Sequence, residues 1–168
     1  MNKNGFFLPI KLFISIAIIA IIITLTFSFW KVAEKNLAEK ELEKEIDKVI
    51  ANVETMSGYY RDVYNYLDEN GSKREIEITL PSSIEYVSFG GNADGNIVSD
   101  GKCIFYKING KSMHVKWLEN IKFRKGIKNG IWIPSEEAFV IKKAGNYRLI
   151  FENVRQGNDK FVIIYSQT

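Results

Sequence analysis

The N-terminal part of the chain contains one long apolar stretch. Residues 12–30 read LFISIAIIAIIITLTFSFW and include no charged side chain. A helix of about 20 residues, rising 1.5 Å per residue, crosses the ~30 Å hydrocarbon layer of a bilayer. The stretch is apolar on every face, whereas a core helix of a soluble protein usually keeps a polar face. The pattern therefore predicts a transmembrane helix.

A cleaved secretory signal peptide is the first alternative for this stretch. Signal peptides have a shorter apolar region, about 7–15 residues, followed by small residues at the cleavage site. Here the stretch ends in the bulky residues Phe27, Phe29 and Trp30, and Lys31 follows. The sequence favours an uncleaved anchor, with Trp30 at the membrane–water interface.

A second helical pattern follows the apolar stretch. Its apolar residues alternate between spacings of four and three, which is a strong helical signal: Leu42, Ile46, Val49, Val53, Met56, Tyr60, Val63 and Leu67. A coiled coil would keep charged residues beside this stripe. The stripe instead widens towards its C-terminal half, so we expect the helix to lie against a sheet and to end near Leu67, before Asn70-Gly71.

The pattern changes to short β-type runs after Gly71. Residues 75–80 alternate polar and apolar side chains and stop at Pro81, and residues 84–89 alternate likewise. Residues 102–108 and 111–118 flank Asn109-Gly110, which predicts a hairpin with a two-residue turn and positive φ at both turn positions. Further strands are expected at residues 121–123, 131–133, 139–141, 147–151 and 160–165, with a loop over residues 153–159.

The expected fold class is therefore α+β. A long N-terminal helix, transmembrane in its first half, packs its second half on a C-terminal antiparallel β domain of six to eight strands. The boundaries are a transmembrane half at 6–30, an extramembrane half at 31–69 and a β domain at 70–168, after a short leader at 1–5.

Composition narrows the functional classes. The chain has 23 basic and 20 acidic side chains, a net charge of +3, and the two signs interleave. A nucleic-acid binder would show a dominant basic cluster, so no nucleic-acid partner is expected. Lys/Arg counts beside the apolar stretch would place the C-terminal side in the cytoplasm. Long domains translocate largely regardless of charge, however, and we favour an extracytoplasmic β domain.

Few side chains could carry chemistry. His114 and Cys103 are the only histidine and cysteine, so they make neither a zinc-ligand set nor a disulfide. Residues 92–96, Asn-Ala-Asp-Gly-Asn, lack the regular oxygen ligands and closing Glu of a calcium loop and are better read as a turn. No catalytic residue, cofactor or metal is predicted, so an enzyme is unsupported.

Asn70-Gly71-Ser72 is an N-glycosylation sequon at the expected helix-to-strand turn. Asn70 is therefore a candidate glycosylation site, and this is compatible with an extracytoplasmic domain.

The N-terminus reads Lys3-Asn4-Gly5-Phe6-Phe7-Leu8-Pro9-Ile10-Lys11. It resembles the start of type IV pilins and pseudopilins, in which a short basic leader ends in Gly before Phe. The resemblance implies that a prepilin peptidase cuts after Gly5 and leaves Phe6 as the new N-terminus. It also implies a structural role in a surface filament or secretion machine, with membrane lipid and other pilin-like subunits as partners.

The chain departs from the family in three places. Most bacterial members have Glu where this chain has Ile10, Lys11 adds a charge to the expected apolar core, and Asn4 stands where a charge is commoner. These features resemble archaeal pilins or minor pseudopilins. The rival hypothesis is a signal-anchored extracytoplasmic domain that binds a ligand or partner and does not polymerise.

Overall fold

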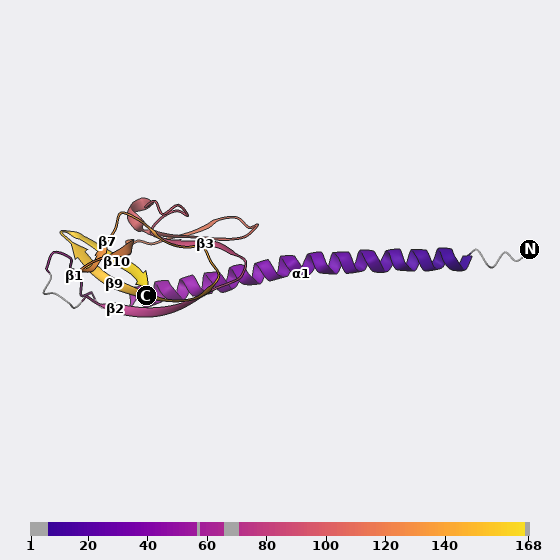
Figure 1. The fold of residues 1–168 in the computed structure, drawn as a ribbon, viewed down its shortest axis with the longest axis horizontal. Coiled ribbons are helices and arrows are strands. Elements are labelled where there is room, and N and C mark those ends of the chain that lie inside the picture. Colours follow the sequence, from indigo (N-terminus) through magenta and orange to yellow (C-terminus); the bar gives the residue numbers. More distant parts are fainter. Residues whose placement is uncertain (1–6, 57, 66–70, 167–168) are drawn as a thin grey trace, which may run out of the picture. The chain divides into compact units, whose positions relative to one another are not determined.

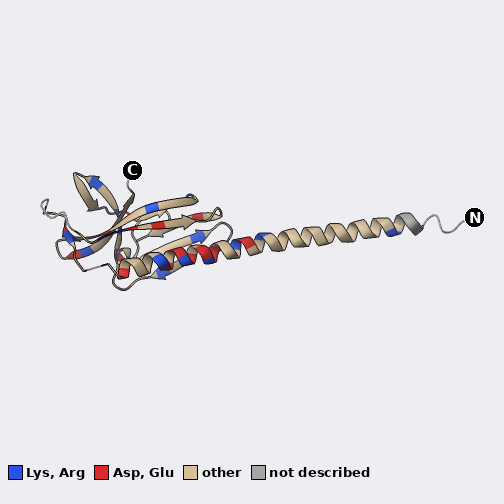
Figure 2. Cartoon of the chain, turned by 90° about the horizontal axis from the view of Figure 1, so that it is seen from below, with Lys and Arg blue, Asp and Glu red and all other residues tan. Residues whose placement is uncertain are grey.

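The computed structural model describes residues 7–56, 58–65 and 71–166. The chain divides into two compact units, Met1–Leu37 and Ala38–Thr168. Its single long helix, α1, comprises Phe7–Glu54. Almost all of the charged side chains of α1 gather in its C-terminal part, whereas the apolar stretch before it is drawn nearly free of charge (Figure 2). The predicted α+β fold class is confirmed at this level.

The β domain contains ten strands and one 3₁₀ turn in the described residues (Figure 1). Their bounds are β1 Arg61–Asp62, β2 Lys73–Leu80, β3 Ile84–Phe89, η1 Ser99–Gly101, β4 Cys103–Ile108, β5 His114–Trp117, β6 Phe123–Asn129, β7 Ile131–Pro134, β8 Phe139–Ile141, β9 Gly145–Gln156 and β10 Asp159–Ser166.

The predicted helix end near Leu67 is wrong, because α1 ends at Glu54 and β1 follows. Arg74 of β2 donates from Nη1 to the Asn52 carbonyl oxygen at 2.7 Å and so satisfies a carbonyl of the last helical turn. Val63 continues the helical spacing of apolar residues but packs elsewhere, with Ile150 and Val154. The helix thus stops before Gly58, and Leu67 lies outside the described residues.

The strands form two sheets, which corrects the expectation of one antiparallel sheet. One sheet has the order β1-β9-β10-β6-β7, with β2 also paired to β9, and the other has the order β5-β4-β3-β8. The first sheet is mixed, because β1 runs parallel to β9 and β10 runs parallel to β6. Parallel neighbours need a long connection, and residues 130–158 supply it between β6 and β10.

Two predicted turns differ in detail. The hairpin between β4 and β5 exists, with an Ile108-to-Lys111 turn closed by a 3.0 Å backbone hydrogen bond. Only Gly110 has positive φ there, so this is not the mirror-image turn that was expected. The loop expected at residues 153–159 is shorter, because β9 continues to Gln156 and pairs with Asp159 across a Gly157-Asn158 turn.

The C-terminal part of α1 supplies the centre of the main core. The predicted apolar stripe is confirmed as far as Val53: Leu42, Ile46, Val49 and Val53 are all buried. They pack with apolar side chains of both sheets, including Ile76, Ile78 and Leu80, the buried half of the predicted alternation in β2. Phe89, Phe123 and Phe151 meet edge-to-face in the same core, with ring centroids 5.6–6.3 Å apart.

Candidate functional sites

The apolar segment of α1, residues 12–30, is the first candidate site. Its large apolar side chains are exposed in the isolated chain, including Phe13, Ile21 and Trp30. Among the described residues, α1 is the one helix long and apolar enough to cross a membrane. A membrane anchor and a signal sequence both satisfy this criterion of length and composition, so the finding supports an N-terminal membrane-directed segment.

Three hydroxyl groups in the C-terminal part of this segment donate hydrogen bonds to carbonyl groups of the helix itself. Thr24 donates to the Ala20 carbonyl oxygen at 2.8 Å, Thr26 to Ile22 at 2.8 Å, and Ser28 to Thr24 at 2.9 Å. Each bond spans one helical turn, so these three hydroxyl donors do not face hydrocarbon unpaired. These residues therefore do not disfavour a lipid environment.

The second half of α1 is joined to the β4–β5 hairpin by ion pairs. Glu39 lies 2.6 Å from His114 Nε2 and 3.2 Å from Lys111 Nζ. Lys116 of β5 pairs with Glu43 and with Asp47 of the helix. His114 also stacks on Tyr106, with ring centroids 5.3 Å apart. The only histidine thus fastens the hairpin to the helix, a contact with Glu39 that no local sequence pattern predicts.

Glu39 itself shows the electrostatic effect of these contacts. Burial raises the pKa of its carboxyl, but hydrogen bonds from Lys111 and His114 lower it, and the net result is a lowered pKa. The carboxylate is therefore the favoured form beside its two basic neighbours.

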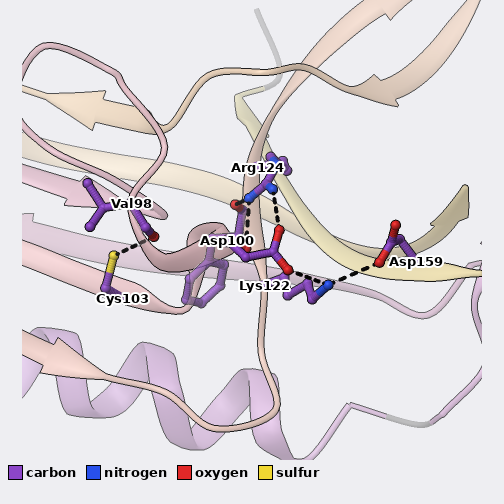
Figure 3. A network of polar contacts seen from close by, with 7 residues as sticks. Val98, Asp100, Cys103, Lys122, Arg124 and Asp159 are labelled. Atoms are coloured by element: carbon purple, nitrogen blue, oxygen red, sulfur yellow. Dashed lines mark hydrogen bonds and ion pairs between the residues drawn. The ribbon is translucent and has the colours of Figure 1, made fainter.

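A second polar network joins η1, β6 and β10 (Figure 3). Arg124 donates from Nη2 to Asp100 Oδ1 at 3.0 Å and from Nη1 to the Asp100 carbonyl oxygen at 3.1 Å. Lys122 pairs with the other Asp100 oxygen and, at 3.0 Å, with Asp159. The hydrogen bond from Lys122 is the largest cause of a lowered Asp100 pKa. Ser99 and Asp100 have positive φ values of 47° and 57°, and it is Asp100 that the Arg124 and Lys122 contacts hold.

Cys103 lies beside this network in surroundings that disfavour a reactive thiolate. Its side chain is buried, and Sγ lies 3.4 Å from the Val98 carbonyl oxygen (Figure 3). Burial raises the pKa of the thiol to about 11, so the thiolate is scarce at neutral pH.

The outer face of the larger sheet holds a buried ion pair. Arg61 donates from Nε to Glu152 Oε1 at 2.6 Å and from Nη2 to the Trp132 carbonyl oxygen at 2.5 Å. Tyr165 donates its hydroxyl to Glu152 Oε2 at 2.8 Å, and its ring stacks on Trp132 at 4.1 Å. Burial is the first cause of a raised Tyr165 pKa, and Glu152 adds to it. The cluster attaches the segment after α1 to β9.

A cavity of about 510 Å³ lies at the C-terminal end of α1. It is lined by residues of the helix end, the β5–β6 connection, β9 and β10: Val53, Glu54, Met56, Tyr60, Trp117, Leu118, Glu119, Asn120, Ile121, Asn153 and Val162. The sequence alone did not predict this cavity. Its lining residues form no motif along the chain, because only the fold brings them together.

The site residues predicted from the sequence, Gly5, Phe6 and Asn70, lie outside the described residues. The turn at residues 92–96 is closed by Asn92 Oδ1, which accepts the backbone N–H groups of Asp94 and Asn96 at 3.0 Å. Within the described part of the chain, no three His, Cys, Asp or Glu side chains converge in a way that could hold a metal ion.

Comparison with known proteins gave no match: no family model, no curated protein and no solved structure is similar to this chain.

Proposed function

We propose that this chain is a membrane-anchored structural subunit of the type IV pilin-like class, a minor pilin or pseudopilin that acts by helix-mediated assembly. One observation supports this most directly. The single helix α1 has exposed apolar side chains at residues 12–30, and between Ala38 and Val53 its apolar side chains are the centre of the β-domain core. The same element thus serves both as the anchor and as the scaffold of the folded domain.

Assembly follows from the two environments that such a segment tolerates. In the bilayer, lipid covers the apolar side chains of residues 12–30. Outside the bilayer, only other apolar surfaces can cover so large a patch, and equivalent helices of neighbouring subunits are the complementary ones. The β domain then remains extracytoplasmic and presents its loops to the surroundings.

The sequence start supports the same proposal. Gly5-Phe6 stands where pilin-like chains are processed, and the apolar segment begins shortly after it. Ile10 stands where most bacterial members have Glu, and Lys11 adds a charge to the expected apolar core. For this reason we propose a minor subunit rather than the main repeating one.

The mature N-terminus tests the proposal. Mass spectrometry of the chain purified from the membranes of its native cells should give a protein that begins at Phe6, with a methyl group on its amine. A Gly5→Val variant should keep its leader, whereas the matched Gly58→Val variant, where an added Cβ meets no atom within 4 Å, should be processed normally. A wild-type chain that retains Met1 or Asn2 would contradict the proposal.

The second candidate is a signal-anchored extracytoplasmic domain that binds a partner and does not polymerise. The cavity at the end of α1 favours it, because such a cavity is not needed for helix-mediated assembly. The two functions separate in a surface-filament fraction sheared from cells. A pilin-like subunit is recovered there, whereas an anchored domain stays entirely with the membrane.

A further inference from the structure

The cavity at the end of α1 has an apolar floor and a polar rim. Val53, Ile121 and Val162 are buried and form the apolar part of its lining, with Asn153 as a buried amide among them. Glu54, Glu119 and Asn120 are exposed lining residues at the mouth. A ligand that fills this cavity therefore needs an apolar body and a polar head.

The charge of the lining selects the head group. The described residues of the lining include the carboxylates of Glu54 and Glu119 and no Lys or Arg side chain. The cavity also lies at the C-terminal end of α1, where the carbonyl groups of a helix favour positive charge. The guanidinium group of Arg74 already satisfies one of these carbonyl groups, because it donates to the Asn52 carbonyl oxygen. Among the described lining residues, Glu54 and Glu119 are the charged ones.

A cation of the chain itself, the ammonium group of Lys160, already lies beside the cavity. Lys160 Nζ lies 4.9 Å from the centre of the Tyr60 ring, a cation–π distance, and Tyr60 is a lining residue. The volume of about 510 Å³ is within the usual range of roughly 300–1,000 Å³ for small-molecule sites.

We propose that this cavity binds an amphipathic organic cation, in which an apolar chain or ring occupies the floor and an ammonium group lies between Glu54 and Glu119. The proposal is independent of pilin-like assembly, because the whole cavity belongs to the Ala38–Thr168 unit.

Three probes of matched size test the charge preference. The full-length chain in an uncharged detergent is titrated with hexylammonium, hexanol and hexanoate, and methyl shifts of Val53, Ile121 and Val162 are followed by NMR. Hexylammonium should bind most tightly and hexanoate least. Equal binding of all three, or shifts spread over the domain without a maximum at these methyl groups, would overturn the proposal.

Charge variants give effects of opposite sign. Glu54→Gln and Glu119→Gln should each weaken hexylammonium binding by about two- to fivefold, the range of an exposed ion pair. Lys160→Gln should strengthen it, because it removes a like charge beside Tyr60. Glu136→Gln, an exposed carboxylate outside the cavity lining, is the matched control and should leave the affinity unchanged. Hexanol affinity should change little in all four variants, so a parallel loss for hexanol would show damage to the cavity and contradict the assigned role of charge.

Discussion

Arg61 and Glu152 form an ion pair at 2.6 Å although their side chains are only 4% and 1% exposed. The pair joins β1 to β9, and Tyr165 and the Trp132 carbonyl group complete much of its hydrogen bonding. Arg61 Nη1 is buried without a hydrogen-bond partner in the described part of the chain. The pair therefore holds the segment after α1 in place, while one donor remains unsatisfied.

Removing one partner of this pair should destabilise the β domain strongly. Arg61→Met leaves the Glu152 carboxylate buried without its main counter-charge, a change that typically costs about 3–5 kcal/mol. The double variant Arg61→Met/Glu152→Leu should recover part of this loss, because it removes both charges. Urea unfolding followed by tryptophan fluorescence measures both effects. Arg148→Met is the control, since Arg148 is 67% exposed and pairs at the surface with Glu75 and Glu77, where a change below about 1 kcal/mol is expected.

Two leucines of α1 provide a matched test of where the helix enters the core. Leu42 is fully buried, whereas Leu37 is 59% exposed. Leu42→Ala should lower the free energy of unfolding by about 2–5 kcal/mol through lost burial and a residual cavity. Leu37→Ala should change it by less than about 0.5 kcal/mol. Equal effects of the two substitutions would contradict the packing described for this helix.

The sequence predicted those features that depend on local periodicity. The alternating run in β2 and the helical stripe from Leu42 to Val53 are visible as patterns, because each buries one face against a partner. The predicted end of α1 is wrong because Tyr60 and Val63 continue the helical spacing by coincidence. Val63 packs instead in a second core, beside Ile150. The capping of the helix by Arg74 depends on a strand distant in sequence.

The same limit explains what was missed in the candidate sites. The parallel pairing of β10 with β6 has no local sequence signature, because it depends on the path that a long connection takes across the sheet. The cavity combines residues from Val53 to Val162, and no spacing rule relates them. The predicted strand at His114 is confirmed. Its contact with Glu39 depends on tertiary packing and has no signal in the local sequence.

The Asp100 network predicts a specific acid dependence. The pKa of Asp100 is lowered in the folded chain, so its contribution to stability is fully present above the unfolded-state pKa of about 4 and is lost as pH falls through the lower folded-state value. Asp100→Asn should therefore be less stable than the wild type at pH 7, and the difference should shrink towards pH 3. Unfolding curves at pH 7, 5 and 3 measure it.

Asp94→Asn is the control for this dependence, because Asp94 makes no ion pair that the described structure contains and lies in the loop that precedes η1. Its difference from the wild type should stay nearly constant over the same pH range. A constant difference for Asp100→Asn as well would show that the Lys122 and Arg124 contacts do not stabilise the fold through charge.

Cys103 should be inert in the folded protein. Its thiol is buried and its pKa is raised to about 11. A thiol-specific reagent at pH 8 therefore cannot reach the sulfur atom easily and finds little thiolate to react with. We expect reaction only after unfolding, in a molar ratio of one. An engineered Ser112→Cys variant, at an exposed position of the β4–β5 hairpin, should react rapidly in the native state and so verify the reagent. Rapid labelling of wild-type Cys103 would show that the β3–β4 region opens readily.

The membrane role of residues 12–30 can be tested with one charge at the middle of the segment. Ile21 is 60% exposed in the isolated chain and is flanked by apolar residues on both sides. Ile21→Lys places an ammonium group near the bilayer centre, at an insertion cost of about 2.5–3.5 kcal/mol. The variant should be recovered less in the alkali-resistant membrane fraction than the wild type. Leu37→Lys adds the same charge outside the segment and should leave membrane recovery unchanged. If both variants fractionate like the wild type, the segment is not what holds the chain in the membrane. If the two lose membrane association equally, the effect comes from net charge and not from the position of Ile21 in hydrocarbon.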